Sequence, residues 1–157
     1  MAWFLSRLIL AGVVKSALAL EARSIATYER LRGSAGNARA CSDALHESLC
    51  RLLAEEELHR KILLDAAHGR LSLSELEGLL KEHVSPTVEE IKPLDAETLS
   101  QWGQELLSAL EQEEKTCAFY GNLQRMSRIP LVRKAFEALA RMEKEHVDVL
   151  RTLLGRA

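Results

Sequence analysis

The chain is poor in aromatic residues and proline, and it has no excess of positive charge. Aromatic residues make up 4% of its 157 residues, and three residues are proline. The chain has 21 Lys and Arg residues and 23 Asp and Glu residues. Scarce aromatics and prolines, beside abundant Ala, Leu, Glu, Arg and Lys, favour helices throughout. With a formal net charge of −2 and no basic tract, the composition predicts no nucleic-acid partner.

Cysteine is scarce as well. Cys41, Cys50 and Cys117 form no Cys-x-x-Cys pair, which excludes a zinc ribbon or a rubredoxin-type iron site built from them. On one helix Cys41 and Cys50 would lie about 13 Å apart, beyond the reach of a disulfide bond. We therefore expect a reducing, cytoplasmic setting.

The sequence also lacks a long hydrophobic run. Near the N-terminus, Arg7 and Lys15 limit the uncharged stretch to residues 8–14, which is too short to cross a bilayer. Ala17-Leu18-Ala19 could serve as a signal-peptidase site, but Arg7 follows the first apolar cluster instead of preceding it. We expect the first helix of a bundle, with contact between this helix and a membrane surface as the alternative.

What the sequence does contain is four long amphipathic patterns. Apolar residues recur at spacings of three and four over residues 2–32, 38–67, 96–126 and 130–154. Each of these ranges is predicted to form one helix. Gly33 to Asn37 is expected to end the first helix, and Ser74-Glu75-Leu76-Glu77 predicts a capping box that opens a short helix. Asp95 is expected to cap the third long helix, and Pro130 to open the fourth.

The connection between the second and third long helices sets the expected topology. An up-down-up-down bundle needs only a few residues there, whereas about 28 residues can return along a bundle roughly 40 Å long. The sequence therefore predicts an all-α fold, with residues 1–157 forming a single domain. That domain would be a ferritin-like four-helix bundle with a long crossover between helices two and three.

Two Glu-x-x-His motifs lie inside the apolar stripes. Glu56 and His59 sit among Leu52, Leu53 and Ile62, and Glu143 with His146 occupies the same place in the last helix. An ionised carboxylate in an apolar interior costs several kcal/mol unless it is paired, hydrogen-bonded or bound to a metal. Two such motifs in one chain indicate that the buried carboxylates share one compensating partner.

The two halves of the chain repeat each other. The matched residues are Glu21 with Glu113 and Tyr28 with Tyr120, at an offset of 92, and Glu56 with Glu143 and His59 with His146, at an offset of 87. Four carboxylates and two imidazoles thus meet in a two-fold-related core. Two divalent ions would balance the charge of four glutamates, so the pattern predicts a dinuclear metal site.

This ligand pattern resembles that of ferritin-like di-iron carboxylate proteins, most closely the rubrerythrin-like group, over essentially the whole chain. The resemblance implies two iron ions as cofactor, although the same ligands also accept manganese or a mixed pair. It implies bridging Glu56 and Glu143, terminal Glu21 and Glu113, and one coordination sphere completed by each of His59 and His146. Tyr28 and Tyr120 would hydrogen-bond across to ligating carboxylates.

Two departures from the rubrerythrin pattern bear on activity. The cysteines of a rubredoxin-type domain are absent, so electrons would come from a separate donor protein, and Thr116 stands where these proteins commonly hold a further carboxylate. We expect an oxidoreductase that reacts with dioxygen or peroxide. Two alternatives stay open: hydroxylation of a lipophilic, quinone-like substrate at a membrane touched by Trp3, Phe4, Leu5 and Leu8, and iron storage or sequestration. A homodimer is also left open.

The remaining polar residues are interpreted as structural. Glu55 and Glu145 lie one helical step off the stripes, so Glu55→Ala or Glu145→Ala is expected to leave metal binding intact. Glu111 and Glu114 are expected to be surface charges. Cys117 is interpreted as a small buried hydrophobe. The three histidines outside the motifs, His46, His68 and His83, are interpreted as surface residues or satisfied core residues.

Overall fold

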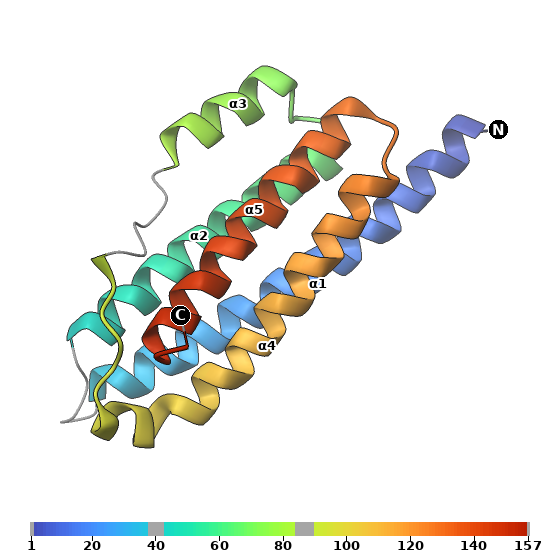
Figure 1. Ribbon diagram of the computed structural model, residues 1–157. Helices are drawn as coiled ribbons and strands as arrows, with labels where there is room; N and C mark the ends of the chain where they lie inside the picture. The colour runs from blue at the N-terminus through green and yellow to red at the C-terminus, as the bar shows by residue number, and fades with distance from the viewer. Residues whose placement is uncertain (1, 38–42, 84–89, 157) are drawn as a thin grey trace.

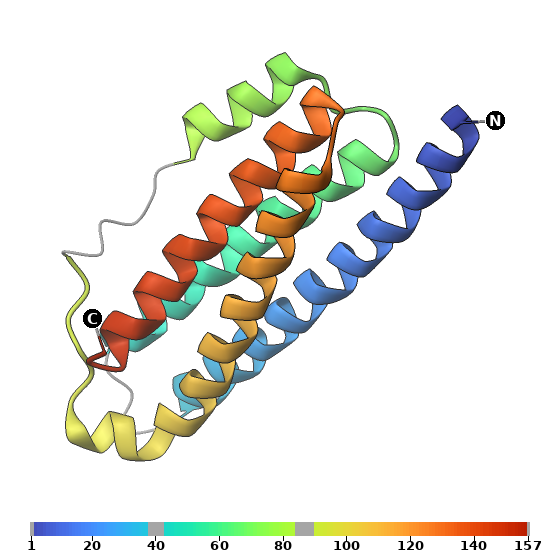
Figure 2. The ribbon, with the colours of Figure 1, turned by 45° about the vertical axis from the view of Figure 1, so that its right-hand side comes forward.

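The computed structural model describes residues 2–37, 43–83 and 90–156, which form helices and connections without a strand. The helices are α1 (Ala2–Asn37), α2 (Asp43–Ala67), α3 (Leu73–Glu82), α4 (Ala96–Met126) and α5 (Pro130–Leu153). In Figures 1 and 2, α1 runs antiparallel to α2, α4 runs antiparallel to α5, and α3 lies outside the four long helices. The predicted all-α, ferritin-like bundle is confirmed.

The crossover makes α2 and α4 parallel. Both helices start at the same end of the bundle in Figures 1 and 2, so the chain returns the length of the bundle between them, as the long connection predicted. Pro86 lies outside the described residues. Where the crossover ends, the Leu94 amide donates a hydrogen bond to the Leu153 carbonyl oxygen at 2.9 Å. That bond ties the start of α4 to the last turn of α5.

Capping chemistry sets the helix boundaries, with one correction. Asp95 caps α4 by accepting a hydrogen bond from the Thr98 amide at 2.8 Å, as predicted. The cap of α3 is Ser72 and not Ser74: the Ser72 amide donates to Glu75 Oε2 at 2.7 Å, and Ser72 Oγ accepts from the Glu75 amide. Both serines precede a glutamate by three residues, but only Ser72 is flanked by Leu71 and Leu76, which are both buried as a hydrophobic staple.

The predicted end of α1 is also wrong. The helix continues through Gly33 and ends at Asn37. A helical glycine costs about 1 kcal/mol relative to alanine. Leu31 and Ala35, on either side of Gly33, are each 1% exposed against the bundle, so packing outweighs the local preference for a turn. Residues 38–42, including Cys41, lie outside the described part of the chain.

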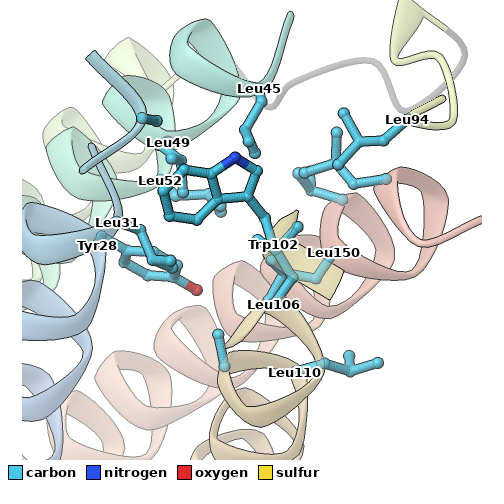
Figure 3. Packing of buried hydrophobic residues seen from close by; sticks show 14 of the residues in the cluster. Tyr28, Leu31, Leu45, Leu49, Leu52, Leu94, Trp102, Leu106, Leu110 and Leu150 are labelled. Atoms are coloured by element: carbon cyan, nitrogen blue, oxygen red, sulfur yellow. The ribbon is translucent and has the colours of Figure 1, made fainter. Parts of the chain in front are cut away.

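The hydrophobic core consists of two clusters, one toward each end of the bundle. Figure 3 shows the first, in which the Trp102 indole packs near Leu45 and Leu49 from α2 and near Leu106 from its own helix. The second cluster is built mainly from Val14, Ala17, Ile62, Leu63, Tyr120, Phe136 and Leu139. On each long helix the residues between the two clusters are polar and buried, which creates a polar layer across the middle of the bundle.

In the described ranges, no helix has the length and apolar character needed to cross a membrane. The side chains of Trp3, Phe4, Leu5 and Leu8 lie outside the described residues. Membrane contact by the start of α1 therefore stays a prediction.

Candidate metal centre

The polar layer contains all six residues predicted as metal ligands. Each of the four long helices contributes to it: Glu21 from α1, Glu56 and His59 from α2, Glu113 from α4, and Glu143 and His146 from α5. None of the six is more than 1% exposed. The apolar stripes therefore carry these polar groups to one level of the core, as the repeat predicted.

The two imidazoles stack at the centre of the layer. Their ring centroids are 5.1 Å apart and the rings are inclined by 12°. His59 Nδ1 lies 3.0 Å from Glu143 Oε1, 3.5 Å from Glu21 Oε2 and 3.9 Å from Glu56 Oε2. One imidazole nitrogen thus faces three carboxylates from three different helices.

His146 repeats this arrangement from the other half. Its Nδ1 lies 3.0 Å from Glu56 Oε1, 3.5 Å from Glu143 Oε2 and 4.0 Å from Glu113 Oε2. Glu56 and Glu143 therefore face both imidazoles. Glu113 accompanies only His146, just as Glu21 accompanies only His59.

Two tyrosines support the carboxylates that face one imidazole each. Tyr28 on α1 donates a hydrogen bond to Glu113 Oε1 on α4 at 2.8 Å, and Tyr120 on α4 donates to Glu21 Oε1 on α1. Burial and the neighbouring carboxylates raise the pKa of both phenols, so both remain protonated donors. These are the cross-bundle hydrogen bonds that the family resemblance implied.

The carboxyl groups of the layer have strongly perturbed pKa values. Burial raises the pKa of Glu56 and of Glu113, and the nearby Glu143 carboxylate raises both further. Burial acts in the same direction on Glu143. There, the contacts with Glu113, His146 and His59 outweigh burial and hold its pKa well below the usual range. In the metal-free protein, Glu143 is therefore the anion that the other groups surround.

The imidazoles respond to the same charges. Burial lowers the pKa of His59, but the nearby Glu143 and Glu21 carboxylates outweigh it and raise that pKa to about 9. The pKa of His146 is likewise raised against burial, by Glu143, Glu55 and Glu56. Without metal, both imidazoles accordingly act as counterions to the carboxylates.

The donor set of the layer fits metal ions. Four buried carboxylate oxygens, the Oε2 atoms of Glu21, Glu56, Glu113 and Glu143, have no hydrogen-bond partner in the described part of the chain. Leaving one such group unpaired costs about 1–3 kcal/mol or more. Ligand atoms from Glu56, His59, Glu143 and His146 all lie within 4.8 Å of one another. Carboxylate and imidazole ligands suit divalent iron, manganese and zinc.

Glu55 is the residue that the sequence interpretation missed. Its predicted placement off the apolar stripe is wrong: Glu55 is 6% exposed, and its Oε2 lies 2.6 Å from His146 Nε2. A carboxylate on the far nitrogen fixes the orientation and tautomer of a ligating imidazole. The offset of 87 residues could have found it, because it pairs Glu55 with Met142, an apolar residue in the last stripe.

Other polar residues near the layer have structural partners. Glu114 is exposed and pairs with Arg151 at 2.7 Å, as a surface charge should. Thr116 is buried, and its hydroxyl donates a hydrogen bond to the Gln112 carbonyl oxygen of the same helix at 3.0 Å. The Cys117 thiol donates to a carbonyl oxygen of α5, and burial raises its pKa.

The histidines outside the motifs differ from one another. His46 and His68 are exposed, as predicted, and His46 Nε2 lies 3.6 Å from the Cys50 sulfur. The His83 side chain is 7% exposed, and its Nε2 lies 3.5 Å from Glu145 Oε2 but has no hydrogen-bond partner in the described residues. The prediction that His83 is a surface or satisfied core residue is therefore wrong.

Comparison with known families found one match, to the C-terminal part of the chain. Residues 105–157, which cover most of α4 and all of α5, match the family model described as Rubrerythrin. No curated protein and no solved structure matches the chain. The matched segment contains Glu113, Glu143 and His146. The match and the buried Glu/His cluster confirm the resemblance to the rubrerythrin-like group.

Proposed function

We propose that this chain, whose C-terminal third matches Rubrerythrin, is a di-iron oxidoreductase that reacts with dioxygen or peroxide. One observation carries the proposal: Glu56 and Glu143 each face both buried imidazoles, whereas Glu21 and Glu113 face one each. Shared and unshared carboxylates in this arrangement suit two ions side by side.

Each residue would have a definite place around the two ions. Glu56 and Glu143 would be shared by both, Glu21 and His59 would belong to one ion, and Glu113 and His146 to the other. Four carboxylates balance two divalent ions, so loading the centre removes the like-charge repulsion of the metal-free layer.

Two ferrous ions held in such a centre would supply two electrons, which together with two protons would reduce one hydrogen peroxide molecule to two water molecules. The chain provides the setting for that reaction. The two hydrophobic clusters shield the layer from bulk water on both sides. Tyr28 and Tyr120 hold the unshared carboxylates in place and keep their protons.

Restoring the reduced centre requires electrons from elsewhere. The three cysteines of the chain include no pair suited to a rubredoxin-type iron site. We infer that a separate electron donor protein returns them, and that dioxygen or peroxide is the small-molecule partner.

Anaerobic loading followed by oxidant addition tests this function. Protein loaded with Fe²⁺ should retain at least two irons per chain and oxidise two of them rapidly, using about one peroxide per two irons. Glu143→Gln removes a shared charge and should abolish retention of both irons and the rapid oxidation. Glu114→Gln, on the exposed face of α4, is the matched control and should behave as the native chain does.

Three results would contradict the proposal. The first is equal iron retention by the native chain and Glu143→Gln, which would mean that the layer does not hold the metal. The second is retention of two irons that react with neither peroxide nor dioxygen. The third is slow oxidation with many irons retained per chain, which would indicate iron storage.

A further inference from the structure

We propose that Glu55, His83 and Glu145 form a third metal site, for a single divalent first-row ion, next to the dinuclear centre. One ligand atom from each of the three residues lies within 4.8 Å of the other two. Carboxylate and imidazole donors together suit iron, manganese, cobalt and zinc. The proposal goes beyond the dinuclear centre, because none of these three residues belongs to the six-residue set.

Three separate elements bring the ligands together. Glu55 comes from α2 and Glu145 from α5, and His83 is the C-cap residue that follows α3. α3 packs against α5, with Leu76 fully buried beneath it. The capping box at Ser72 and the contact of Leu76 fix where α3 lies, and hence where His83 meets the bundle.

The state of His83 is the observation that points to a ligand. Its side chain is 7% exposed, yet Nε2 is buried and has no hydrogen-bond partner among the described residues. The nearest carboxylate oxygen, Glu145 Oε2, is 3.5 Å away, longer than a normal hydrogen bond. Two ligands held about 2.1 Å from one ion at a tetrahedral angle are about 3.4 Å apart. The separation therefore fits two ligands of a shared ion.

The internal repeat sets this cluster apart from the dinuclear centre. At the offset of 87 residues, Glu55 corresponds to Met142 and Glu145 to Leu58. The two carboxylates thus replace apolar residues on one side of the bundle only, which is the side that His83 approaches. A dinuclear centre needing such carboxylates for its own charge balance would have them in both halves.

Glu55 connects the third site to solvent and to the dinuclear centre. One of its oxygens contacts His146 Nε2 at 2.6 Å, which leaves the other oxygen for a metal ion. Glu55 also lines a cavity of about 170 Å³ together with Glu47, Glu90 and Lys92. Three protein ligands leave the remaining coordination positions to water.

Counting bound Co²⁺ tests the site. Metal-free full-length protein is dialysed against Co²⁺ under anaerobic conditions, and cobalt per chain is measured by elemental analysis. The native chain should bind three Co²⁺ ions. His83→Ala and Glu145→Gln should bind two each and keep the visible absorption bands of Co²⁺ in the dinuclear centre. Glu143→Gln should lose the pair and keep the third ion. His68→Ala, which removes an exposed histidine, is the matched control and should bind three.

The variants test the third site and the dinuclear centre separately. Two ions in the native chain, both lost in Glu143→Gln and both kept in His83→Ala, would overturn the third site alone. One ion, lost in His83→Ala and kept in Glu143→Gln, would support the third site and overturn the dinuclear centre. A third ion lost in His46→Ala, but kept in both His83→Ala and Glu145→Gln, would belong to His46 and Cys50 and would overturn the assignment.

Discussion

The two halves of the bundle carry the same ligands but support their imidazoles differently. His146, on α5, has both nitrogens engaged: Nδ1 with Glu56 at 3.0 Å and Nε2 with Glu55 at 2.6 Å. His59, on α2, contacts Glu143 through Nδ1 at 3.0 Å, and its Nε2 has no hydrogen-bond partner among the described residues. The internal repeat thus preserved the residues that face the centre, but not the carboxylate that contacts the far nitrogen of the imidazole.

The tyrosines show that this difference is local. Tyr28 supports Glu113 and Tyr120 supports Glu21, each across the bundle and each from within one hydrophobic cluster. The unshared carboxylates therefore have equivalent support in both halves. Only the imidazoles differ, so the two metal positions should differ in affinity through their histidines.

Replacing Glu55 should have the largest effect on the difference in affinity between the two metal positions. In Glu55→Gln, His146 loses the carboxylate that orients it, and loss of such a partner typically weakens metal binding about 10- to 100-fold. We expect one of the two dinuclear ions to weaken by this factor and the other to change little. Stepwise Co²⁺ titration in a His83→Ala background measures it, because that background removes the proposed third ion from both samples.

Met142→Leu is the matched control for Glu55→Gln, because it changes the position that the internal repeat pairs with Glu55 without adding or removing a charge. It should leave both affinities near those of the native chain. Equal weakening of both ions in Glu55→Gln would show that Glu55 acts on the layer as a whole and not on His146.

Glu55 also illustrates what the sequence alone could not provide. Helical periodicity and the length of the crossover were enough to predict the bundle, and the two offsets were enough to find the six residues of the layer. Glu55 lies at the edge of its apolar stripe, where periodicity does not decide between core and surface. Its partner is 91 residues away, so only the packing of α2 against α5 determines the contact.

The same reasoning explains the other misses. The path of the crossover decides where His83 meets the bundle, and that path depends on the docking of α3 through Leu71 and Leu76 and not on any motif. At Gly33, tertiary burial of Leu31 and Ala35 overrode the local turn preference. In each case the outcome is set by contacts between elements that are distant in sequence.

The metal-free protein should lose stability as pH rises from about 6.5 to 9. The folded pKa of His59 is about 9 against an unfolded value of about 6.5, so its contribution is fully present below 6.5 and is lost through 9. The raised pKa values of His146, Glu56 and Glu113 act with the same sign. The depressed pKa of Glu143 opposes them only in acid, where its contribution is lost as pH falls below about 4.5.

Thermal melting of metal-free and metal-loaded protein between pH 6 and 9 measures this slope. Bound metal favours ionised carboxylates and neutral imidazoles, so loading should remove the decline. His59→Gln should reduce the slope of the metal-free protein, and Glu55→Gln should reduce it through His146, which extends the comparison of the two imidazoles to proton binding. A metal-free melting temperature that is flat or rises over this range would show that the imidazoles are not counterions of the carboxylates.

The smallest expected difference lies between the two tyrosines. Tyr28→Phe and Tyr120→Phe each remove one hydrogen bond to a carboxylate, worth about 1.5–3 kcal/mol. For a chain of this size, each kcal/mol lowers the melting temperature by about 2–4 °C. Because both hydroxyls support an unshared carboxylate in the same way, the two variants should melt within about 2 °C of each other when metal-loaded. Ser24→Ala is the control, since it removes a buried hydroxyl of α1 that accepts a hydrogen bond from Gln112, which is not one of the six predicted ligands. A clear gap between the two tyrosine variants would mean that the asymmetry extends beyond the histidines to the unshared carboxylates.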